Sequence, residues 1–299
     1  MMIAALELPD IIRTRNGYVF DAVEALGLTL ARFRLAADEF HLIQRFNRSQ
    51  SAISEIVNWV VQFVDQCWSH LLEFDKDFLL SPENLEDYAA AVHHAGAPLN
   101  GVWGFINCTI RAICRPSRWQ RVAYSGHKKF HALKYQVIML PNGLFGHLFG
   151  PWESLRADLV LLDESNILET CQEHAVRAGT DEHTPDQQRY LQIFGDPAYG
   201  NTRQIISPFA GPGERTAEEK EWNERMASVR IEVEHGFGIV ANTFPFLNAG
   251  WKMRVYSSPV GRYYRAAVLF TNAITCLHYN QVSEYFGCKP PHIFDYFHD

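Results

Sequence analysis

Two acidic residues stand where a carboxylate could help to bind a divalent cation. Asp196 follows the apolar run of residues 190–194, and Glu234 lies in the charged stretch of residues 229–238. Hard cations such as Mg²⁺ are held by carboxylate oxygens, and a pair of them can activate a nucleophile and absorb the charge of a leaving phosphodiester oxygen. This chemistry needs acids from distant parts of the chain to converge on one small volume.

Each acid also has an ordinary explanation. An aspartate before a proline, as in Asp196-Pro197, commonly begins a turn, and Glu234 could be a solvated acid on a helix surface. Arg230 lies four residues before Glu234, so on a helix it would share the same face and could orient the carboxylate or contact a phosphate. Taken one at a time, these residues leave both interpretations open.

Three short blocks of the sequence resemble the PIF/Harbinger transposases and the nucleases derived from them. The family pattern is approximately Phe-Ile-Asp-Gly-Thr, then Gly-Asp-x-Ala-Tyr, then Arg-x-x-Val-Glu-x-x-Phe-Gly. The second and third blocks fit residues 195–199 and 230–238. The first fits residues 105–109, except that Asn107 and Cys108 stand in place of Asp and Gly.

The resemblance extends from about Ala97 to the end of the chain. Residues 124–129 are similar to the family's basic strand entry, and Asp158 is similar to its intermediate acidic position. The order and spacing of these blocks carry the resemblance, because each motif alone is weak.

The resemblance implies a metal-dependent endonuclease or transposase that acts on DNA. Asp196 and Glu234 would be two of its catalytic metal ligands, Asn107 would occupy the third position, and Asp158 is a further candidate ligand. The implied cofactor is Mg²⁺ or Mn²⁺ in a two-metal site. Because an asparagine carries no charge, its presence is expected to lower metal affinity or activity by at least about 10–100-fold. Cys108 adds to the change, since glycine permits closer backbone approach.

The main alternative is that the fold is retained as a DNA- or protein-binding module without catalytic activity. Its signature would be salt-sensitive DNA binding that does not depend on Asp196. A hydrolase of another kind is disfavoured, because His93 and His94 are adjacent and would point about 100° apart on a helix. No Gly-x-Ser-x-Gly motif is present either.

Charge is distributed unevenly along a chain whose formal net charge is −7. Residues 101–152 contain no Asp or Glu. The basic residues of that stretch are Arg111, Arg115, Arg118, Arg121, Lys128, Lys129 and Lys134. Such a one-sided segment predicts contacts with DNA phosphates, and the alternative is that these arginines pair with the acids of residues 214–224.

Residues 1–96 are predicted to form a helical module. Apolar residues recur at helical spacing between Ile53 and Trp68, an earlier helix is expected between residues 28 and 42, and residues 45–54 form a polar connection with N-cap residues. The arrangement resembles the helix-turn-helix that precedes the nuclease domain in the family, which would place Arg45 and Arg48 against DNA. A plain helical bundle is the alternative.

Residues 97–299 are predicted to form the nuclease domain. Strands are expected at residues 102–106, 135–140, 144–149 and 191–194, with the Pro141-Asn142-Gly143 turn joining the middle two as a hairpin. Helices are expected at residues 155–168, from the capping box at Thr216 to before Pro245, and at residues 259–285. The fold class is therefore α/β, a mixed sheet flanked by helices, compatible with the ribonuclease-H-like fold that the resemblance implies.

Composition limits the cellular setting. No run of eighteen apolar residues predicts a membrane span, and the six scattered cysteines have no metal-finger spacing, so we expect reduced thiols in an intracellular protein. The resemblance implies the nucleus, with DNA as a partner and a second protein that carries a DNA-binding domain. The oligomeric state and the target DNA are not indicated by the sequence.

Overall fold

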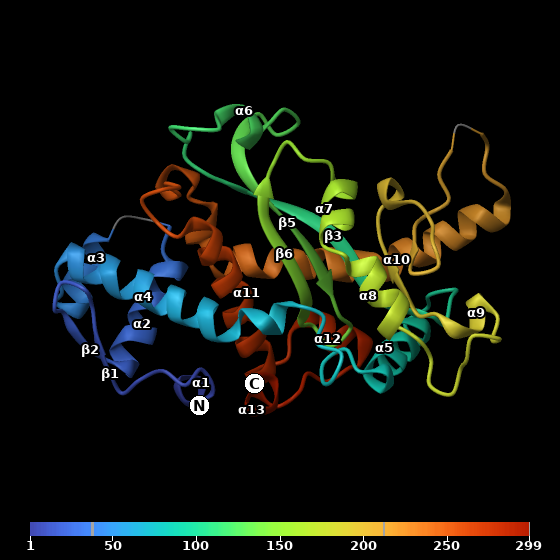
Figure 1. Ribbon diagram of the computed structural model, residues 1–299, viewed down its shortest axis with the longest axis horizontal. Coiled ribbons are helices and arrows are strands. Elements are labelled where there is room, and N and C mark those ends of the chain that lie inside the picture. The colour runs from blue at the N-terminus through green and yellow to red at the C-terminus, as the bar shows by residue number, and fades with distance from the viewer. Residues whose placement is uncertain (37–38, 212, 299) are drawn as a thin grey trace.

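A six-stranded mixed sheet forms the centre of the protein. The computed structural model describes residues 1–36, 39–211 and 213–298. The strand order is β4-β5-β3-β7-β8, and β6 is also paired with β5. Helices flank this sheet (Figure 1). The α/β class is confirmed, and the arrangement is consistent with a ribonuclease-H-like nuclease fold.

The strands of the sheet are β3 (Val102–Ala112), β4 (Tyr124–Ser125), β5 (Phe130–Met139), β6 (Phe145–Glu153), β7 (Gln192–Phe194) and β8 (Ile205–Ile206). β5 pairs antiparallel with β3, β4 and β6, whereas β7 runs parallel to both β3 and β8. The predicted hairpin is confirmed, because the Leu140 amide donates to the Leu144 carbonyl at 2.9 Å and Gly143 takes a φ of +81°. A glycine suits that conformation because it lacks a Cβ.

The helices are α1 (Met2–Ala5), α2 (Ala22–Arg34), α3 (Phe40–Phe46), α4 (Gln50–Trp68), α5 (Pro82–His94), α6 (Gln120–Ala123), α7 (Asp158–Glu164), α8 (Ile167–His174), α9 (Asp186–Arg189), α10 (Ala217–Thr243), α11 (Val260–Leu277), α12 (Gln281–Phe286) and α13 (Ile293–Tyr296). Short 3₁₀ turns occur at η1 (Ser69–Leu72), η2 (Pro197–Tyr199), η3 (Pro245–Asn248) and η4 (Gly250–Lys252). The predicted capping box is confirmed at the start of α10, where Thr216 and Glu219 bond reciprocally.

Two long helices predicted in the second part are each divided in the structure. Residues 155–168 contain α7 and the start of α8, separated where Asn166 adopts a left-handed φ of 50°. Residues 259–285 contain α11 and α12, because Asn280 leaves the helical conformation and caps a new helix through reciprocal bonds with Ser283. In both places an asparagine interrupts an otherwise continuous apolar pattern.

The N-terminal part contains a small sheet that the expectation of an entirely helical module missed. β1 (Ile11–Arg13) and β2 (Val19–Asp21) pair antiparallel around a turn in which Gly17 has a φ of 83°. Strands of this length carry too few residues for a periodic signal. Ser49 caps α4 by accepting from the Ala52 amide, so this helix begins at Gln50, within the stretch expected to be a connection.

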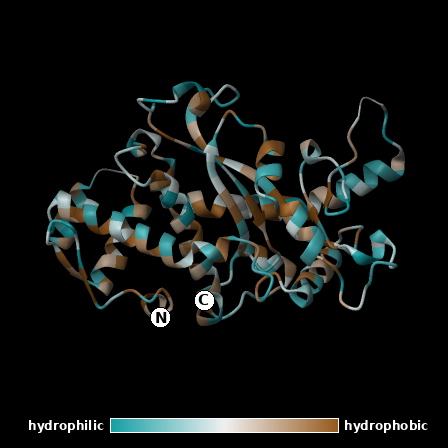
Figure 2. Cartoon of the chain, in the orientation of Figure 1, coloured by the Kyte–Doolittle hydropathy of each residue, from teal (hydrophilic) through white to brown (hydrophobic). Residues whose placement is uncertain are grey.

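The N-terminal helices share one apolar core with the C-terminal part of the chain. The Phe33 ring of α2 lies 5.7 to 6.0 Å from the rings of Phe244, Phe246, Tyr263 and Phe270. Hydrophilic residues concentrate instead on the N-terminal half of α10 and on the loops around α9 (Figure 2). Across the described residues, no helix combines the length and apolar character that crossing a membrane requires.

Candidate active site and nucleic-acid interface

Asn107 and Asp196 lie at corresponding positions, the first on β3 and the second just beyond the end of its parallel partner β7. Phe105 is the partner of Phe194 in the register, and their rings lie 6.2 Å apart on one face of the sheet. Asn107 and Asp196 each follow that pair by two residues, and side chains two residues apart on an extended strand share a face. Asp196 keeps an extended backbone, with φ −76° and ψ 169°. The two positions therefore leave the same face on neighbouring strands.

α10 crosses this face and carries Glu234. Gly236 packs so closely on Met139, the β5 partner of Phe105, that an added Cβ would lie 2.2 Å from the Met139 sulfur. One and a half turns earlier, the Arg230 guanidinium lies 6.0 Å from the centre of the Phe194 ring. Its Nε is 3.1 Å from Oε1 of Glu234. Glu234 thus lies on the helix that covers the face shared by Asn107 and Asp196.

Arg230 has the geometry that was predicted for it. Its side chain is 17% exposed, whereas that of Glu234 is 53% exposed, so the guanidinium is held against the sheet while the carboxylate faces solvent. The pair is an i, i+4 contact on the helix surface, as its spacing predicts. Arg230 therefore positions Glu234 and also offsets part of its negative charge.

Asp196 has a local structural role as well. Its Oδ1 accepts the Ala198 amide at 2.9 Å and so caps η2, while its backbone carbonyl accepts from the Ser207 hydroxyl at 2.8 Å. The turn interpretation of Asp196-Pro197 is therefore correct as far as it goes. It does not exclude a site role, because the cap engages Oδ1, and Oδ2 has no hydrogen-bond partner among the described residues.

Asn107 supplies a neutral oxygen that is already engaged. Its Oδ1 accepts the backbone amide of Cys108 at 2.8 Å. Within the described residues, no three His, Cys, Asp or Glu side chains are placed to bind one metal ion. The trio of Asn107, Asp196 and Glu234 offers hard oxygen donors but only two carboxylates, one of them paired with an arginine. This set fits a divalent cation poorly.

Cys108 and Asp158 belong to a neighbouring cluster. The Cys108 sulfur is 3.4 Å from the Tyr199 hydroxyl, and burial raises the pKa of the Cys108 thiol to about 12, so it stays neutral. Asp158 forms an ion pair with Lys134 at 2.8 Å. Since Lys134 balances its charge, Asp158 in this arrangement is a structural partner of the β5 lysine. Sequence reasoning did not anticipate the contact, and only the strand alternation of Lys134 could have indicated it.

The basic segment, residues 101–152, is largely free of carboxylate partners. Lys128 and Lys129 are exposed, and no described acid pairs with them or with Arg115. No ion pair joins this segment to residues 214–224 in the described part of the chain, so the pairing alternative finds no support. Arg111 differs from the others because its guanidinium lies 4.8 Å from the centre of the Tyr264 ring and packs inward.

Arg45 and Arg48, the two N-terminal arginines predicted to contact DNA, differ in their accessibility to a phosphate. Arg45 is exposed near the end of α3. Arg48 is half-buried, and its Nε and Nη2 donate to both carboxylate oxygens of Glu24 at 2.7 and 2.6 Å. Its guanidinium also lies 4.6 Å from the Phe20 ring. A phosphate would have to displace Glu24 to reach Arg48, whereas Arg45 is directly accessible.

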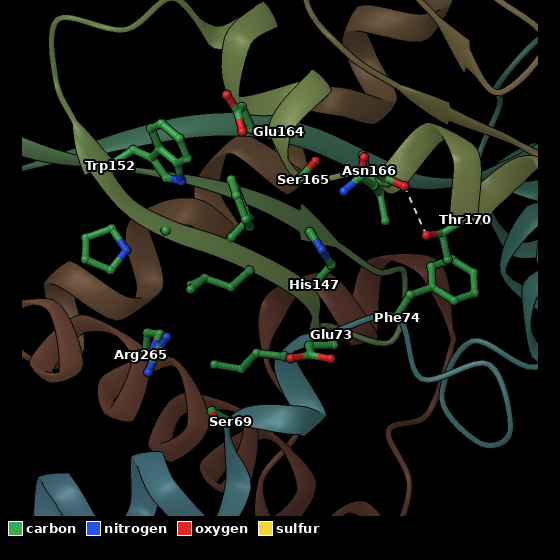
Figure 3. A pocket seen from close by; sticks show the side chains of 16 residues that line it. Ser69, Glu73, Phe74, His147, Trp152, Glu164, Ser165, Asn166, Thr170 and Arg265 are labelled. Atoms are coloured by element: carbon green, nitrogen blue, oxygen red, sulfur yellow. Dashed lines mark hydrogen bonds between the residues drawn. The ribbon is translucent and has the colours of Figure 1, made fainter.

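A cavity of about 640 Å³ lies between η1, β6 and α8, and its lining residues do not include Asp196 or Glu234. Figure 3 shows His147 in its wall, with Glu73 and Arg265 on one side and Ser165 and Asn166 on the other. Burial lowers the pKa of His147 to about 4, and its Nδ1 has no hydrogen-bond partner among the described residues. This histidine is therefore neutral at pH 7 and plays no part in the candidate site.

Comparison with known proteins identifies a family for this part of the chain. The family model described as DDE superfamily endonuclease matches residues 106–272, just over half of the chain, and that range contains Asn107, Asp196 and Glu234. No curated protein and no solved structure gives a significant match. Nucleases of this family generally use divalent metal ions and act on DNA. The chain belongs to the DDE superfamily endonucleases.

Proposed function

We propose that this chain is a PIF/Harbinger-type member of that family, a transposase-derived DNA-binding protein whose cleavage activity is weakened or lost. The observation that supports the proposal is Asn107, a neutral side chain that stands at the first acid of the family pattern, on the strand β3 that pairs in parallel with β7. The sequence blocks at residues 105–109, 195–199 and 230–238 support the subfamily.

The loss of activity follows from electrostatics. Carboxylates hold Mg²⁺ or Mn²⁺ largely through their charge, and an amide oxygen provides none. Arg230 beside Glu234 removes more of the negative potential that would attract a cation. In the proposed arrangement Asp196 and Glu234 remain ligands of low affinity.

The organisation of the whole chain follows the same proposal. Residues 1–96 would serve as a helix-turn-helix-like module that presents Arg45, and residues 97–299 would form the nuclease-type domain. DNA phosphates would contact the basic segment through Arg115, Lys128 and Lys129. A nuclear location and a protein partner with its own DNA-binding domain fit this proposal.

Restoring the acid tests the proposal directly. We expect Asn107→Asp combined with Cys108→Gly to nick supercoiled DNA at least about 10–100-fold faster than the parent chain in Mg²⁺ or Mn²⁺. The measurement is the rate of conversion to the open circular form, with the parent as the reference. Nicking should disappear on chelation of the metal.

The matched control carries Asp196→Asn in the restored background. We expect it to return nicking to the parent level, because the site would again have two acids. If the restored chain cuts no faster than the parent, the idea of a displaced ligand is wrong.

A second candidate is a binding module with no residual chemistry, favoured by the Arg230 pairing of Glu234. In that case Asp196→Ala leaves salt-sensitive DNA binding unchanged, and the restored chain still does not cut. DNA binding that shows no dependence on ionic strength would contradict both candidates.

A further inference from the structure

Two exposed aromatic rings border one cavity, one from the basic segment and one from the loop after η4. Trp119 and Tyr256 are 75% and 67% exposed, although large aromatic side chains are ordinarily much more buried. Both line a cavity of about 380 Å³ whose walls include Ile113, Pro116 and Leu133. The volume is sufficient for a nucleobase. In Figure 1 the neighbouring helix α6 lies at the upper margin of the molecule, beyond the ends of the long strands.

The backbone holds these two aromatic residues in an unusual conformation. Trp119 has a φ of 59° and Tyr256 a φ of 74°. Bulky residues rarely adopt positive φ, and such residues gather where a ligand is gripped. A hydrogen bond of 2.9 Å from the Cys114 amide to the Met253 carbonyl joins the two segments that carry these rings.

The charge around the cavity is mostly positive. Arg118 lines it, and Arg115 and Arg254 on the adjoining loops and Arg121 in α6 are exposed. None of these arginines pairs with a carboxylate within the described ranges. One arginine in the wall and three more on the adjoining segments suit an anionic ligand that carries an apolar ring.

Glu153 is the one acid in the cavity wall. Its side chain is 43% exposed, and its Oε2 forms an ion pair with Nε of Arg156 at 3.7 Å but makes no hydrogen bond in the described part of the chain. That oxygen can therefore still accept a hydrogen bond. The N–H groups on the edge of a nucleobase are suitable donors to it.

We propose that this cavity receives an unpaired nucleobase of a DNA strand, with the face of the base against the Trp119 ring and the flanking phosphates on the arginines. Binding of single strands combines a basic groove with aromatic rings on which bases stack. A base within an intact duplex has no free face, so the site selects frayed, tailed or gapped DNA. This inference rests on the proposed DNA-binding function and adds a preference within it.

The experiment compares two DNA probes that share one duplex, of which only the second has a short 3′ single-stranded tail containing 2-aminopurine. We expect the parent chain to bind the tailed DNA more tightly and to quench the 2-aminopurine fluorescence. Trp119→Ala should lower the affinity for the tailed DNA by about 5- to 150-fold, the range of one base-aromatic stack, and leave the affinity for the plain duplex unchanged. Trp119→Phe should retain most of the preference.

Trp251→Ala is the matched control, because Trp251 is 67% exposed on the neighbouring loop and does not line this cavity. It should behave as the parent on both probes. Equal affinity of the parent for tailed and plain DNA would overturn the nucleobase site while leaving the proposed function intact, and the cavity would then suit a protein partner. Failure of the parent to bind either DNA would overturn the proposed function as well.

Discussion

At residue 107 the proposed site differs from the family pattern in charge rather than in shape. Asparagine and aspartate have the same size, and the contact that Asn107 makes, acceptance of the Cys108 amide by Oδ1, is equally available to a carboxylate. Asn107→Asp should therefore fold as the parent does. Any change in cleavage would report on the restored negative charge.

A second residue, His147, makes stability depend on pH. Its pKa is about 4 in the folded chain because of burial, whereas an unfolded chain has the ordinary value near 6.5. Between these values the unfolded chain binds a proton that the folded chain does not, so acidification from pH 6.5 to 4 favours unfolding. The contribution should reach about 2 kcal/mol at pH 5.

The measurement is urea unfolding of the parent and of His147→Gln at pH 7 and at pH 5. Since glutamine does not titrate, the variant should lose about 2 kcal/mol less of its free energy of unfolding on acidification. Equal losses in the two chains would show that His147 is protonated without unfolding.

Among the elements, the α4–α11 contact depends on one buried carboxylate. Asp65 of α4 is 3% exposed and accepts from Nε and Nη2 of Arg265 at 2.6 and 2.7 Å, with Arg262 Nε at 3.2 Å. Removing its charge leaves two arginines of α11 without their counterion. We expect Asp65→Asn to lower the free energy of unfolding by about 2 to 3 kcal/mol. This is at or below the lower limit for breaking a fully buried ion pair, because both arginines are partly exposed.

Chemical denaturation of Asp65→Asn against the exposed control Asp77→Asn checks this. The control should stay within about 0.5 kcal/mol of the parent. A loss that is no larger in Asp65→Asn would mean that solvent replaces the ion pairs at little cost.

Secondary-structure elements were predictable where they are long and strongly patterned. The capping box at Thr216 and the turn at residues 141–143 fixed two boundaries correctly, because both are local chemical signals. The breaks at Asn166 and Asn280 were missed, because the apolar spacing continues across them. Each break depends on the backbone conformation of a single asparagine, which the spacing does not encode.

The candidate site was only partly predictable for a related reason. The roles of Asn107, Asp196 and Glu234 were predicted from the resemblance alone, and the pairing of β3 with β7 and the packing of α10 on the sheet are encoded by no local pattern. The Lys134–Asp158 pair and the cavity between Trp119 and Tyr256 join segments that are distant in the sequence. Contacts of this kind are set by tertiary packing.

For the molecule as a whole, the basic segment should dominate DNA affinity despite the net charge of −7. Each phosphate contact contributes about 0.9 to the slope of log K against log salt concentration. We expect Lys128→Gln with Lys129→Gln to weaken binding similarly across DNA sequences and to reduce that slope by about 2.

Titration of DNA binding at several salt concentrations measures the slope. Arg203→Gln is the control, because Arg203 is also exposed but is paired with Asp186 at 2.7 Å. An unaltered slope in the double variant would place the phosphate contacts elsewhere.

The cap that Asp196 provides for η2 has a consequence for how such chains are interpreted. An acid that also holds a turn together is retained by selection for folding, whether or not the protein still cuts. Surveys that infer working transposons from surviving acids would therefore overcount them. Under the proposed function, the residue type at position 107 is therefore a better marker of cleavage than the presence of Asp196.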